Sequence, residues 1–378
     1  MFRIVFLLLS VGILTACSDV DNSTPPAELT EYKHTVKPKI NWSKSLGGGK
    51  DPYHTLAPAI VDGHIYSVSA SGLISKVSLD NGKVLWSKDL AQNMYSGLAV
   101  TTAVIALATS EGELKVFENT SDLKLIWSVH VNSEVNTQPV IQQDSIFVHL
   151  SNGQLRSLDL ATGKSNWSIT QLVPALSVTG VSLPVISDDK LISGFDNGTL
   201  VAFDKDTGET AWQKTISVPS GRSDLDRMVD LDGEFAIANG VIYASTFQGR
   251  LSAIQVHNGA ELWSRKMSSI KKISIDAKSV YITDQDSMLW SIDRRTGSAL
   301  WKQDALHHRN LTAMLVQQEH LVVADYQGYA HWLDKLTGTL SARIKVANDK
   351  VNNTPLLYQD MVVFLDVNNK ISAVSLRK

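Results

Sequence analysis

One short segment recurs along nearly the whole chain, and most copies end in a tryptophan. "LRSLDLATGKSNW", "LVAFDKDTGETAW", "LSAIQVHNGAELW" and "LWSIDRRTGSALW" each place a Gly four residues before the final Trp. The repeated tryptophans are 38 to 51 residues apart: Trp42, Trp86, Trp127, Trp167, Trp212, Trp263 and Trp301. An eighth copy, "HWLDKLTGTLSARI", has Gly338 but carries Ala342 in the Trp position. A period of this length indicates a repeat architecture.

The sequence between the tryptophans has the pattern of short β-strands. "GVIYAST", "HLVVADY" and "DKLISGF" are runs of apolar residues bounded by Gly, Asn or Asp. Each unit supplies four strands, and four-stranded units of about 40 residues match the blade of a β-propeller. We therefore expect an all-β, eight-bladed propeller with four-stranded antiparallel blades.

The two ends of the repeat region predict how the ring closes. Trp42 lies in a lone strand, "KINWSKSL", before the first complete unit, and the final "KISAVSLRK" stops one strand short. We expect the N-terminal strand to complete the last blade. The repeat Gly is expected to supply a positive φ in a tight hairpin, and the repeat Asp to accept backbone hydrogen bonds there. Each Trp is expected to cover the neighbouring blade and to bury about 150–250 Å².

The first residues have the composition of an export signal. Arg3 precedes an apolar run from Ile4 to Ile13, which is shorter than the roughly 20 residues needed to span a bilayer. "LTA" then precedes Cys17, the single cysteine. This stretch resembles a bacterial lipoprotein signal, which implies cleavage after residue 16 and acyl chains, palmitate among them, on Cys17. In lipoproteins of this kind, an Asp directly after the Cys implies retention in the inner membrane. The residue here is Ser18, which favours the outer membrane.

Three segments follow from these observations. We expect a signal peptide over residues 1–16, a lipidated Cys17 with a flexible tether over 17–37, and the propeller over 38–378. The tether is predicted because "SDVDNSTPPAELTEY" has few residues that could be buried.

Composition and motifs weigh against several classes of function. With 35 basic and 38 acidic side chains, the chain lacks the basic surface that nucleic acid requires. No nucleophile elbow, metal-ligand spacing or catalytic carboxylate pair is evident, so no catalytic residue, metal or cofactor is expected. The "D-x-x-T-G-x-x-x-W" repeat resembles that of pyrroloquinoline quinone dehydrogenases. The adjacent Cys pair of that family cannot form from one cysteine, but a related periplasmic enzyme or a ligand-binding propeller stays as an alternative.

Two consecutive connections between blades are enlarged relative to four others. The distance from the Trp to the next "V-I-Y"-like strand is 17 to 20 residues in four units, but 24 after Trp167 and 29 after Trp212. The first connection, 170–184, carries Leu172, Val173, Leu176 and Val178, and the second, 217–235, carries several Asp residues with Arg222 and Arg227. Repeat topology places both on the same face, side by side. An apolar floor beside an acidic rim suggests a protein-docking patch. Alternatively, the apolar residues are core and the Asp residues form turns.

The lipoprotein signal, the acidic tether and eight blades together resemble the BamB family of the outer-membrane β-barrel assembly machinery. "LDRMVDLDG", "LLYQD", "LHHRNLT" and "DYQGYAHWLD" carry the resemblance beyond the repeat itself. It implies a non-enzymatic scaffold, anchored in the outer membrane and facing the periplasm, that binds the POTRA domains of BamA. Unfolded outer-membrane proteins are a further candidate partner, and the lipid bilayer is contacted through the acyl chains on Cys17.

The same resemblance implies which residues bind the partner. The family motif "L-S-L-R-G" reads "LSVTG" here, which assigns the role to Leu176 and Val178, with Thr179 in the place of the family Arg. The acidic pair of "S-D-V-D" corresponds to Asp230 and Asp232 in "VDLD", and Arg227 lies in the same segment.

Overall fold

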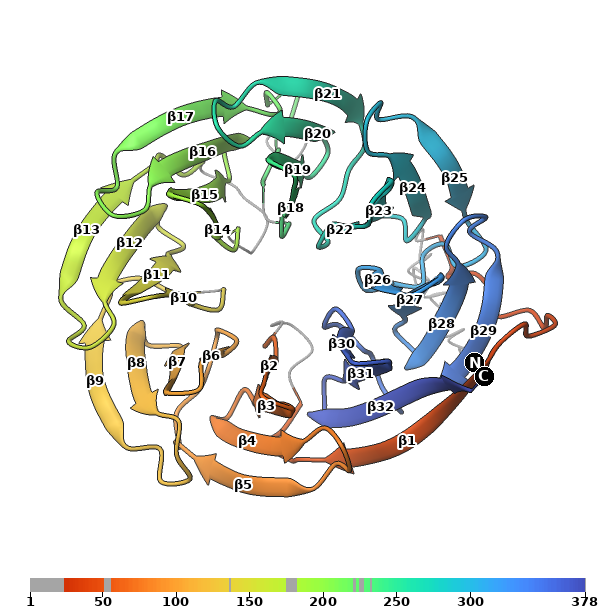
Figure 1. Cartoon of the computed structure of the whole chain (residues 1–378), viewed down its shortest axis with the longest axis horizontal. Coiled ribbons are helices and arrows are strands. Elements are labelled where there is room, and N and C mark those ends of the chain that lie inside the picture. The colour runs from red at the N-terminus through yellow and green to blue at the C-terminus, as the bar shows by residue number, and fades with distance from the viewer. Residues whose placement is uncertain are drawn as a thin grey trace, which may run out of the picture.

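The structure is a computed structural model that describes residues 24–50, 56–135, 137–174, 182–219, 222–223, 228–231 and 233–377. Its strands form eight four-stranded antiparallel sheets, which are arranged as the blades of a ring (Figure 1). This confirms the predicted eight-bladed propeller. Within the described ranges no helix is long and apolar enough to cross a membrane.

The first four blades follow one another along the chain. Blade 1 comprises β2 (Ala59–Val61), β3 (His64–Val68), β4 (Leu73–Ser78) and β5 (Val84–Asp89). Blade 2 comprises β6 (Ala99–Val100), β7 (Val104–Ala108), β8 (Glu113–Glu118) and β9 (Leu125–His130). Blade 3 comprises β10 (Val140–Gln142), β11 (Ser145–His149), β12 (Gln154–Asp159) and β13 (Ser165–Thr170). Blade 4 comprises β14 (Val185–Ser187), β15 (Lys190–Phe195), β16 (Thr199–Asp204) and β17 (Thr210–Thr215).

The remaining blades continue in the same order, and the last one includes the first strand. Blade 5 comprises β18 (Ala236–Ala238), β19 (Val241–Ser245), β20 (Arg250–Gln255) and β21 (Glu261–Lys266). Blade 6 comprises β22 (Ser274–Ile275), β23 (Ser279–Thr283), β24 (Leu289–Asp293) and β25 (Ala299–Gln303). Blade 7 comprises β26 (Leu315–Gln317), β27 (His320–Ala324), β28 (Tyr329–Asp334) and β29 (Leu340–Lys345). Blade 8 comprises β30 (Leu356–Tyr358), β31 (Met361–Leu365), β32 (Lys370–Arg377) and β1 (Lys37–Ser45).

Ring closure takes place in blade 8, as predicted. Strand β1 pairs with β32 in antiparallel register from Lys37↔Arg377 to Ser45↔Lys370, with an irregularity between Ile40 and Trp42. Backbone hydrogen bonds thus join the two ends of the chain. Without β1, one edge of β32 would be unpaired.

The up-and-down order of the strands gives the ring two different faces. The turns between the second and third strands of each blade lie on one face, together with the connectors that lead to the next blade; we call this the connector face. The other two turns of each blade lie on the opposite face, which we call the turn face. The hydrophobic core consists of eight clusters, one at each interface between adjacent blades.

The repeat tryptophans join each blade to the next. The indole N–H of Trp212 donates a 2.7 Å hydrogen bond to the carbonyl oxygen of Val256, and the Trp212 ring lies against Gly259 of blade 5. The same two contacts are made by Trp42, Trp127, Trp167, Trp263 and Trp301. Trp86 packs in a cluster with Leu123, which has φ 47° at the place where the other turns carry Gly. All seven tryptophans therefore lie at the boundary with the next blade.

The hairpin turns contain the contacts that the repeat predicts. In blade 4, Oδ1 of Asp204 accepts hydrogen bonds from the backbone N–H and the hydroxyl of Thr207, at 2.8 and 3.1 Å. Gly208 follows with φ 76°, a left-handed conformation that glycine adopts without steric cost. A Cβ at Gly208 would lie 2.7 Å from the ring of Trp167, so the same position also needs a residue without a side chain.

The missing eighth tryptophan has a structural reason. Ala342 lies in β29, and the neighbouring blade 8 has no turn between its two outer strands because β1 comes from the start of the chain. Val36 and Ile40 instead pack against the cluster that contains the buried Ala342. The backbone N–H of Thr35 also donates to the carbonyl oxygen of Ser341 at 2.8 Å. The incoming chain therefore occupies the place that a Gly turn and a Trp fill elsewhere.

Candidate partner-binding face

The two enlarged connectors both begin on the connector face. One joins β13 to β14 and the other joins β17 to β18. The N–H of Gln171 donates to the carbonyl oxygen of Gly153, and the N–H of Ile216 donates to that of Gly198, at 3.0 and 2.9 Å. A Cβ at Gly198 would lie 2.4 Å from the carbonyl oxygen of Ser217, so glycine is required for this approach. Each connector thus starts against the hairpin of its own blade.

The far ends of the two connectors meet on strand β15. The backbone N–H of Gly194 donates to Oγ of Ser182, in the first connector, at 2.9 Å. A Cβ at Gly194 would lie 2.7 Å from the carbonyl oxygen of Leu231 and 2.8 Å from the ring of Phe235, both in the second connector. A single glycine of blade 4 therefore contacts both connectors, and their described ends lie side by side.

A buried histidine of blade 3, His149, contacts the first connector. Nδ1 of His149 lies 3.1 Å from the carbonyl oxygen of Ser182 and 3.1 Å from Oγ of Ser193, and its ring contacts Phe195 edge-on at 4.9 Å. Burial disfavours the charged imidazolium and lowers the pKa of His149 to about 4. The neutral imidazole can therefore accept or donate one hydrogen bond here without carrying a charge into the core.

Asp230 does not occupy the exposed rim position that the sequence suggests. It is 0% exposed, and its carbonyl oxygen accepts a 2.9 Å hydrogen bond from the N–H of Phe247. The reason lies in its neighbours: Val229 packs over Gly198, and Leu231 is buried in the cluster between blades 4 and 5. In this conformation the backbone of Asp230 binds Phe247 of blade 5, and its buried carboxylate is not accessible to a partner.

Among the described residues of the two connectors, three large apolar side chains are exposed. Leu172 is 88% exposed, Val173 is 40% exposed and Val218 is 71% exposed. We call these three residues the connector patch. Isolated apolar residues are common on protein surfaces, but three on adjacent enlarged connectors fit a docking site better. Leu172 and Val173 are part of the predicted apolar floor. Val218 is not among the predicted residues, although an apolar residue beside Pro219 and outside any strand pattern is a usable signal.

Several predicted residues cannot be placed. Cys17, Leu176, Val178, Thr179, Arg227 and Asp232 lie outside the described residues. Their roles therefore stay predictions.

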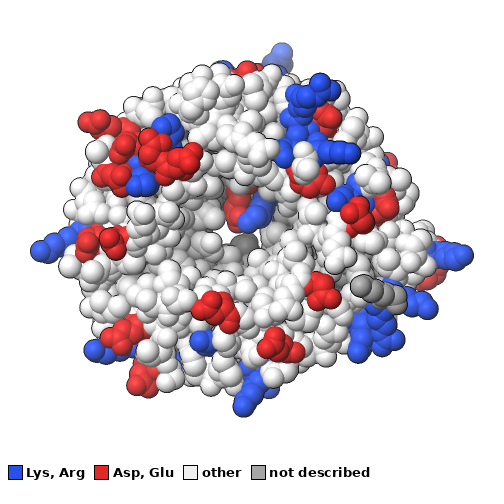
Figure 2. Space-filling view, viewed as in Figure 1, with Lys and Arg blue, Asp and Glu red and all other residues white. Residues whose placement is uncertain are grey.

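The charges visible on one face do not form a single-sign surface. Figure 2 shows Lys and Arg interspersed with Asp and Glu around the ring, and a hollow at its centre. Among the described residues no group of three or more His, Cys, Asp or Glu side chains could hold a metal ion. The surface seen in this view has no extended basic area of the kind that binds nucleic acid.

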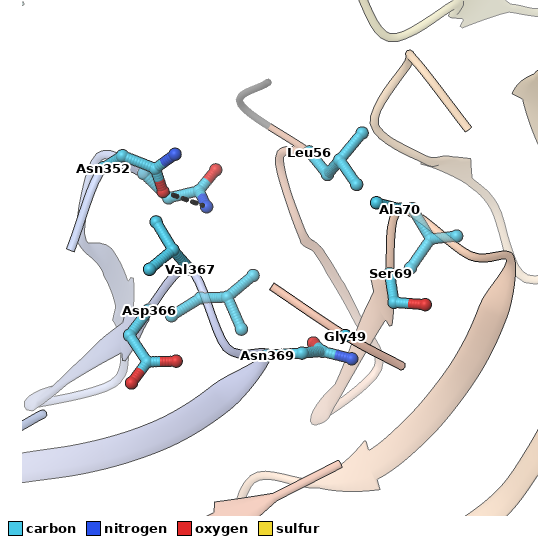
Figure 3. A pocket seen from close by; sticks show the side chains of 11 residues that line it. Gly49, Leu56, Ser69, Ala70, Asn352, Asp366, Val367 and Asn369 are labelled. Atoms are coloured by element: carbon cyan, nitrogen blue, oxygen red, sulfur yellow. Dashed lines mark hydrogen bonds between the residues drawn. The ribbon is translucent and has the colours of Figure 1, made fainter. Parts of the chain in front are cut away.

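A small cavity lies at the seam where the ring closes (Figure 3). Its volume is about 30 Å³, and it is lined by Leu56, Ser69 and Ala70 of the blade 1 side and by Asn352 and Asp366 of blade 8, among others. Burial raises the pKa of Asp366. This volume holds about one water molecule and is too small for an organic ligand.

Comparisons with known proteins identify the family. The sequence model described as "Outer membrane protein assembly factor BamB" matches residues 70–303 and 292–378. A curated protein of that name from Pseudomonas aeruginosa is 32% identical over 372 residues, which cover 98% of each chain. The protein of that name from Escherichia coli K12 is 30% identical over 366 residues, 92% of each chain.

Solved structures agree on the fold. The crystal structure of BamB from Moraxella catarrhalis has a TM-score of 0.83 at 21% identity and covers 90% of this chain and 100% of that chain. A quinohemoprotein alcohol dehydrogenase from Pseudomonas putida has a TM-score of 0.74 at 13% identity, covering 90% and 76%. The enzyme thus shares the architecture, whereas the full-length curated relatives are named as assembly factors. The chain belongs to the family of outer membrane protein assembly factor BamB.

Proposed function

We propose that this protein is a non-enzymatic, lipid-anchored scaffold whose connector face binds the periplasmic POTRA domains of BamA. The observation that carries the proposal is the connector patch: Leu172, Val173 and Val218 are exposed on two adjacent connectors that are longer than most others in the ring. Family membership supplies the process, which is the assembly of outer-membrane proteins.

The chemistry of the patch suits a protein partner. Apolar side chains at the centre of an interface are removed from water on binding, and each fully buried Leu or Val contributes about 1.5–3 kcal/mol. The patch residues directly follow fixed positions, because the N–H of Gln171 donates to the carbonyl oxygen of Gly153 and the N–H of Ile216 donates to that of Gly198. Asp232, Arg227, Leu176, Val178 and Thr179 belong to the same connectors and are proposed to complete the contact.

Co-purification tests the proposal. The variant Leu172→Asp/Val218→Asp places two charges in the connector patch and should abolish recovery of BamA from detergent-solubilised envelopes. The matched control is Leu336→Asp, a residue that is 75% exposed in a hairpin of the turn face. Normal BamA recovery with the double variant, with its folding verified by circular dichroism, would refute the binding face.

The lipid anchor is tested separately. We propose that Cys17 carries acyl chains, since two or more chains give durable membrane attachment. Cys17→Ser should abolish palmitate labelling and release the protein from the membrane fraction. A Cys17→Ser protein that stays in the membrane fraction after a carbonate wash would argue against the anchor.

A further inference from the structure

Residues 27–36 do not extend freely from the propeller but lie along the outside of blade 7; we call them the strap. Figure 1 shows this red segment beside β28 and β29. Near the start of β29, the N–H of Thr35 donates to the carbonyl oxygen of Ser341 at 2.8 Å. Further along β29, Nη1 of Arg343 donates to the carbonyl oxygen of Thr30, and its Nη2 donates to Oε1 of Glu31, both at 3.2 Å.

Aromatic contacts strengthen the middle of the strap. The guanidinium of Arg343 lies 5.7 Å from the ring centres of both Tyr32 and Tyr329. Such cation–π contacts contribute about 0.5–1 kcal/mol at exposed sites and more when water is excluded. Burial against the propeller raises the pKa of Tyr32 to about 12. Arg343 therefore links the strap to the propeller through one side chain with four partners.

The other end of the strap is held on the connector face. The N–H of Ala27 donates to the carbonyl oxygen of His307 at 3.0 Å, and Nη1 of Arg309 donates to that of Ala27 at 2.8 Å. His307 and Arg309 lie in the connector between β25 and β26. Arg309 is itself buried and donates to Oδ2 of Asp325 through Nε and Nη2, at 2.9 and 2.6 Å. This anchoring point is therefore rigid.

Apolar packing adds to these polar contacts. Leu29 packs against the cluster between blades 6 and 7, and Val36 packs against the cluster between blades 7 and 8. Their neighbours Thr30 and Lys33 are exposed. Leu29 and Val36 thus pack against the propeller, whereas Thr30 and Lys33 are exposed to solvent.

The order of these contacts fixes the direction of the strap. Strand β29 runs from the turn face to the connector face, and the strap runs antiparallel to it, with Thr35 at its start and Ala27 beyond its end. The chain that precedes the strap therefore departs from the connector face. Residues 18–26 separate the strap from Cys17, and nine residues can span at most about 30 Å.

We infer that the strap turns the connector face toward a lipid surface, because it fixes the point where the tether of an acylated Cys17 leaves the propeller. This inference rests on the lipid-anchor part of the proposed function. The connector patch lies across the ring from blade 7, on blades 3 and 4 (Figure 1). A partner bound to the patch would then sit between the propeller and the membrane, which suits a partner that is itself embedded in that membrane.

Hydrogen exchange tests the docking of the strap without a membrane. In the full-length protein the amides of Ala27 and Thr35 should be protected. The variant Leu29→Asp/Tyr32→Asp alters only the strap and should make them exchange about tenfold faster or more. The control Thr30→Asp/Lys33→Asp adds the same side chains at exposed positions and should leave exchange unchanged. Unprotected amides of Ala27 and Thr35 in the unaltered protein would contradict the docking of the strap on the propeller.

Energy transfer to a labelled membrane tests the orientation. The acylated protein is reconstituted into vesicles of phosphatidylethanolamine and phosphatidylglycerol that carry a head-group acceptor dye. A donor dye is attached at Glu111→Cys, an exposed site on the connector face, or at Glu209→Cys, an exposed site on the turn face. Transfer should be higher from position 111, and Leu29→Asp/Tyr32→Asp should abolish the difference.

The outcomes separate the two proposals. Equal transfer from both positions in vesicle-bound protein, or a difference that survives in the strap variant, would contradict the inference while leaving the anchor intact. Protein that does not remain with the vesicles would contradict the lipid anchor and, with it, the orientation that depends on it.

Discussion

Trp212 of blade 4 donates its indole N–H to the carbonyl oxygen of Val256 in blade 5, and its ring lies against Gly259 of the same blade. The pair joins the outer strand of one blade to the hairpin of the next. The contact recurs at six of the eight interfaces between blades, and at each of these an aromatic ring, a hydrogen bond and a glycine hold one blade to the next. Stability of the scaffold should therefore depend on these three parts.

Replacing the aromatic ring should destabilise the propeller strongly. Trp212→Ala removes the ring contact and the hydrogen bond to Val256, and truncations of this kind cost about 3–5 kcal/mol. Urea unfolding followed by circular dichroism measures the loss. Leu262→Ala, at a half-exposed position of an outer strand, should change the free energy of unfolding by less than about 1 kcal/mol. Equal losses in the two variants would contradict the docking role.

The glycine beneath the ring should tolerate no side chain. Gly259→Ala places a Cβ 2.7 Å from the Trp212 ring, whereas Gly240→Ala meets nothing within 4 Å. The two glycines have nearly the same φ, 72° and 71°, so the backbone cost cancels in the comparison. We expect Gly259→Ala to be more destabilising by about 1–3 kcal/mol, as found for overpacked cores. The same stability in both variants would show that the ring can move aside.

Acid should weaken the propeller through His149. Its pKa is about 4 in the folded protein and 6.5 in the unfolded chain, so between these values the unfolded chain binds more protons. The contribution of His149 is fully present above pH 6.5 and falls by about 3 kcal/mol as the pH falls to 4. His149→Gln should make the pH dependence shallower in this window, whereas His257→Gln, at an exposed position, should not. Parallel curves for all three proteins would contradict this assignment.

The buried ion pair of Arg309 and Asp325 should show strong coupling. Arg309→Met leaves the carboxylate of Asp325 buried without the guanidinium. The loss of one partner of a buried ion pair should lower the free energy of unfolding by about 3–5 kcal/mol. The double variant Arg309→Met/Asp325→Leu removes both charges and should recover part of that loss. Urea unfolding of the two single variants and the double variant gives the coupling energy. Additive losses would mean that the two charges do not depend on each other.

The repeat predicts most of the fold because each blade reuses the same local chemistry. The Gly and Trp positions, the Asp in the turn and the lone first strand are all short-range patterns, and the structure confirms them. Ala342 departs from the pattern for a reason that depends on where the chain begins, which a local pattern does not contain. Its explanation needs the three-dimensional position of Val36.

The site and the strap are harder to predict because they lack periodicity. The connector lengths locate the enlarged connectors, but no periodicity in an irregular segment indicates which side chains face inward, so the burial of Asp230 cannot be predicted from the sequence. The strap has the polar composition of a tether, and its docking depends on a few contacts, chiefly Leu29 and Arg343, with residues about 300 positions away. Composition alone cannot reveal such pairs.

The central claim, that the connector face binds the partner, is tested most directly by an affinity measurement with purified components. Titration of the soluble POTRA domains of BamA against Leu172→Asp/Val218→Asp should give a Kd at least about tenfold weaker than that of the unaltered protein, a loss of about 1.4 kcal/mol or more. Leu336→Asp should bind with unchanged affinity. An unchanged Kd for a correctly folded double variant would contradict the account.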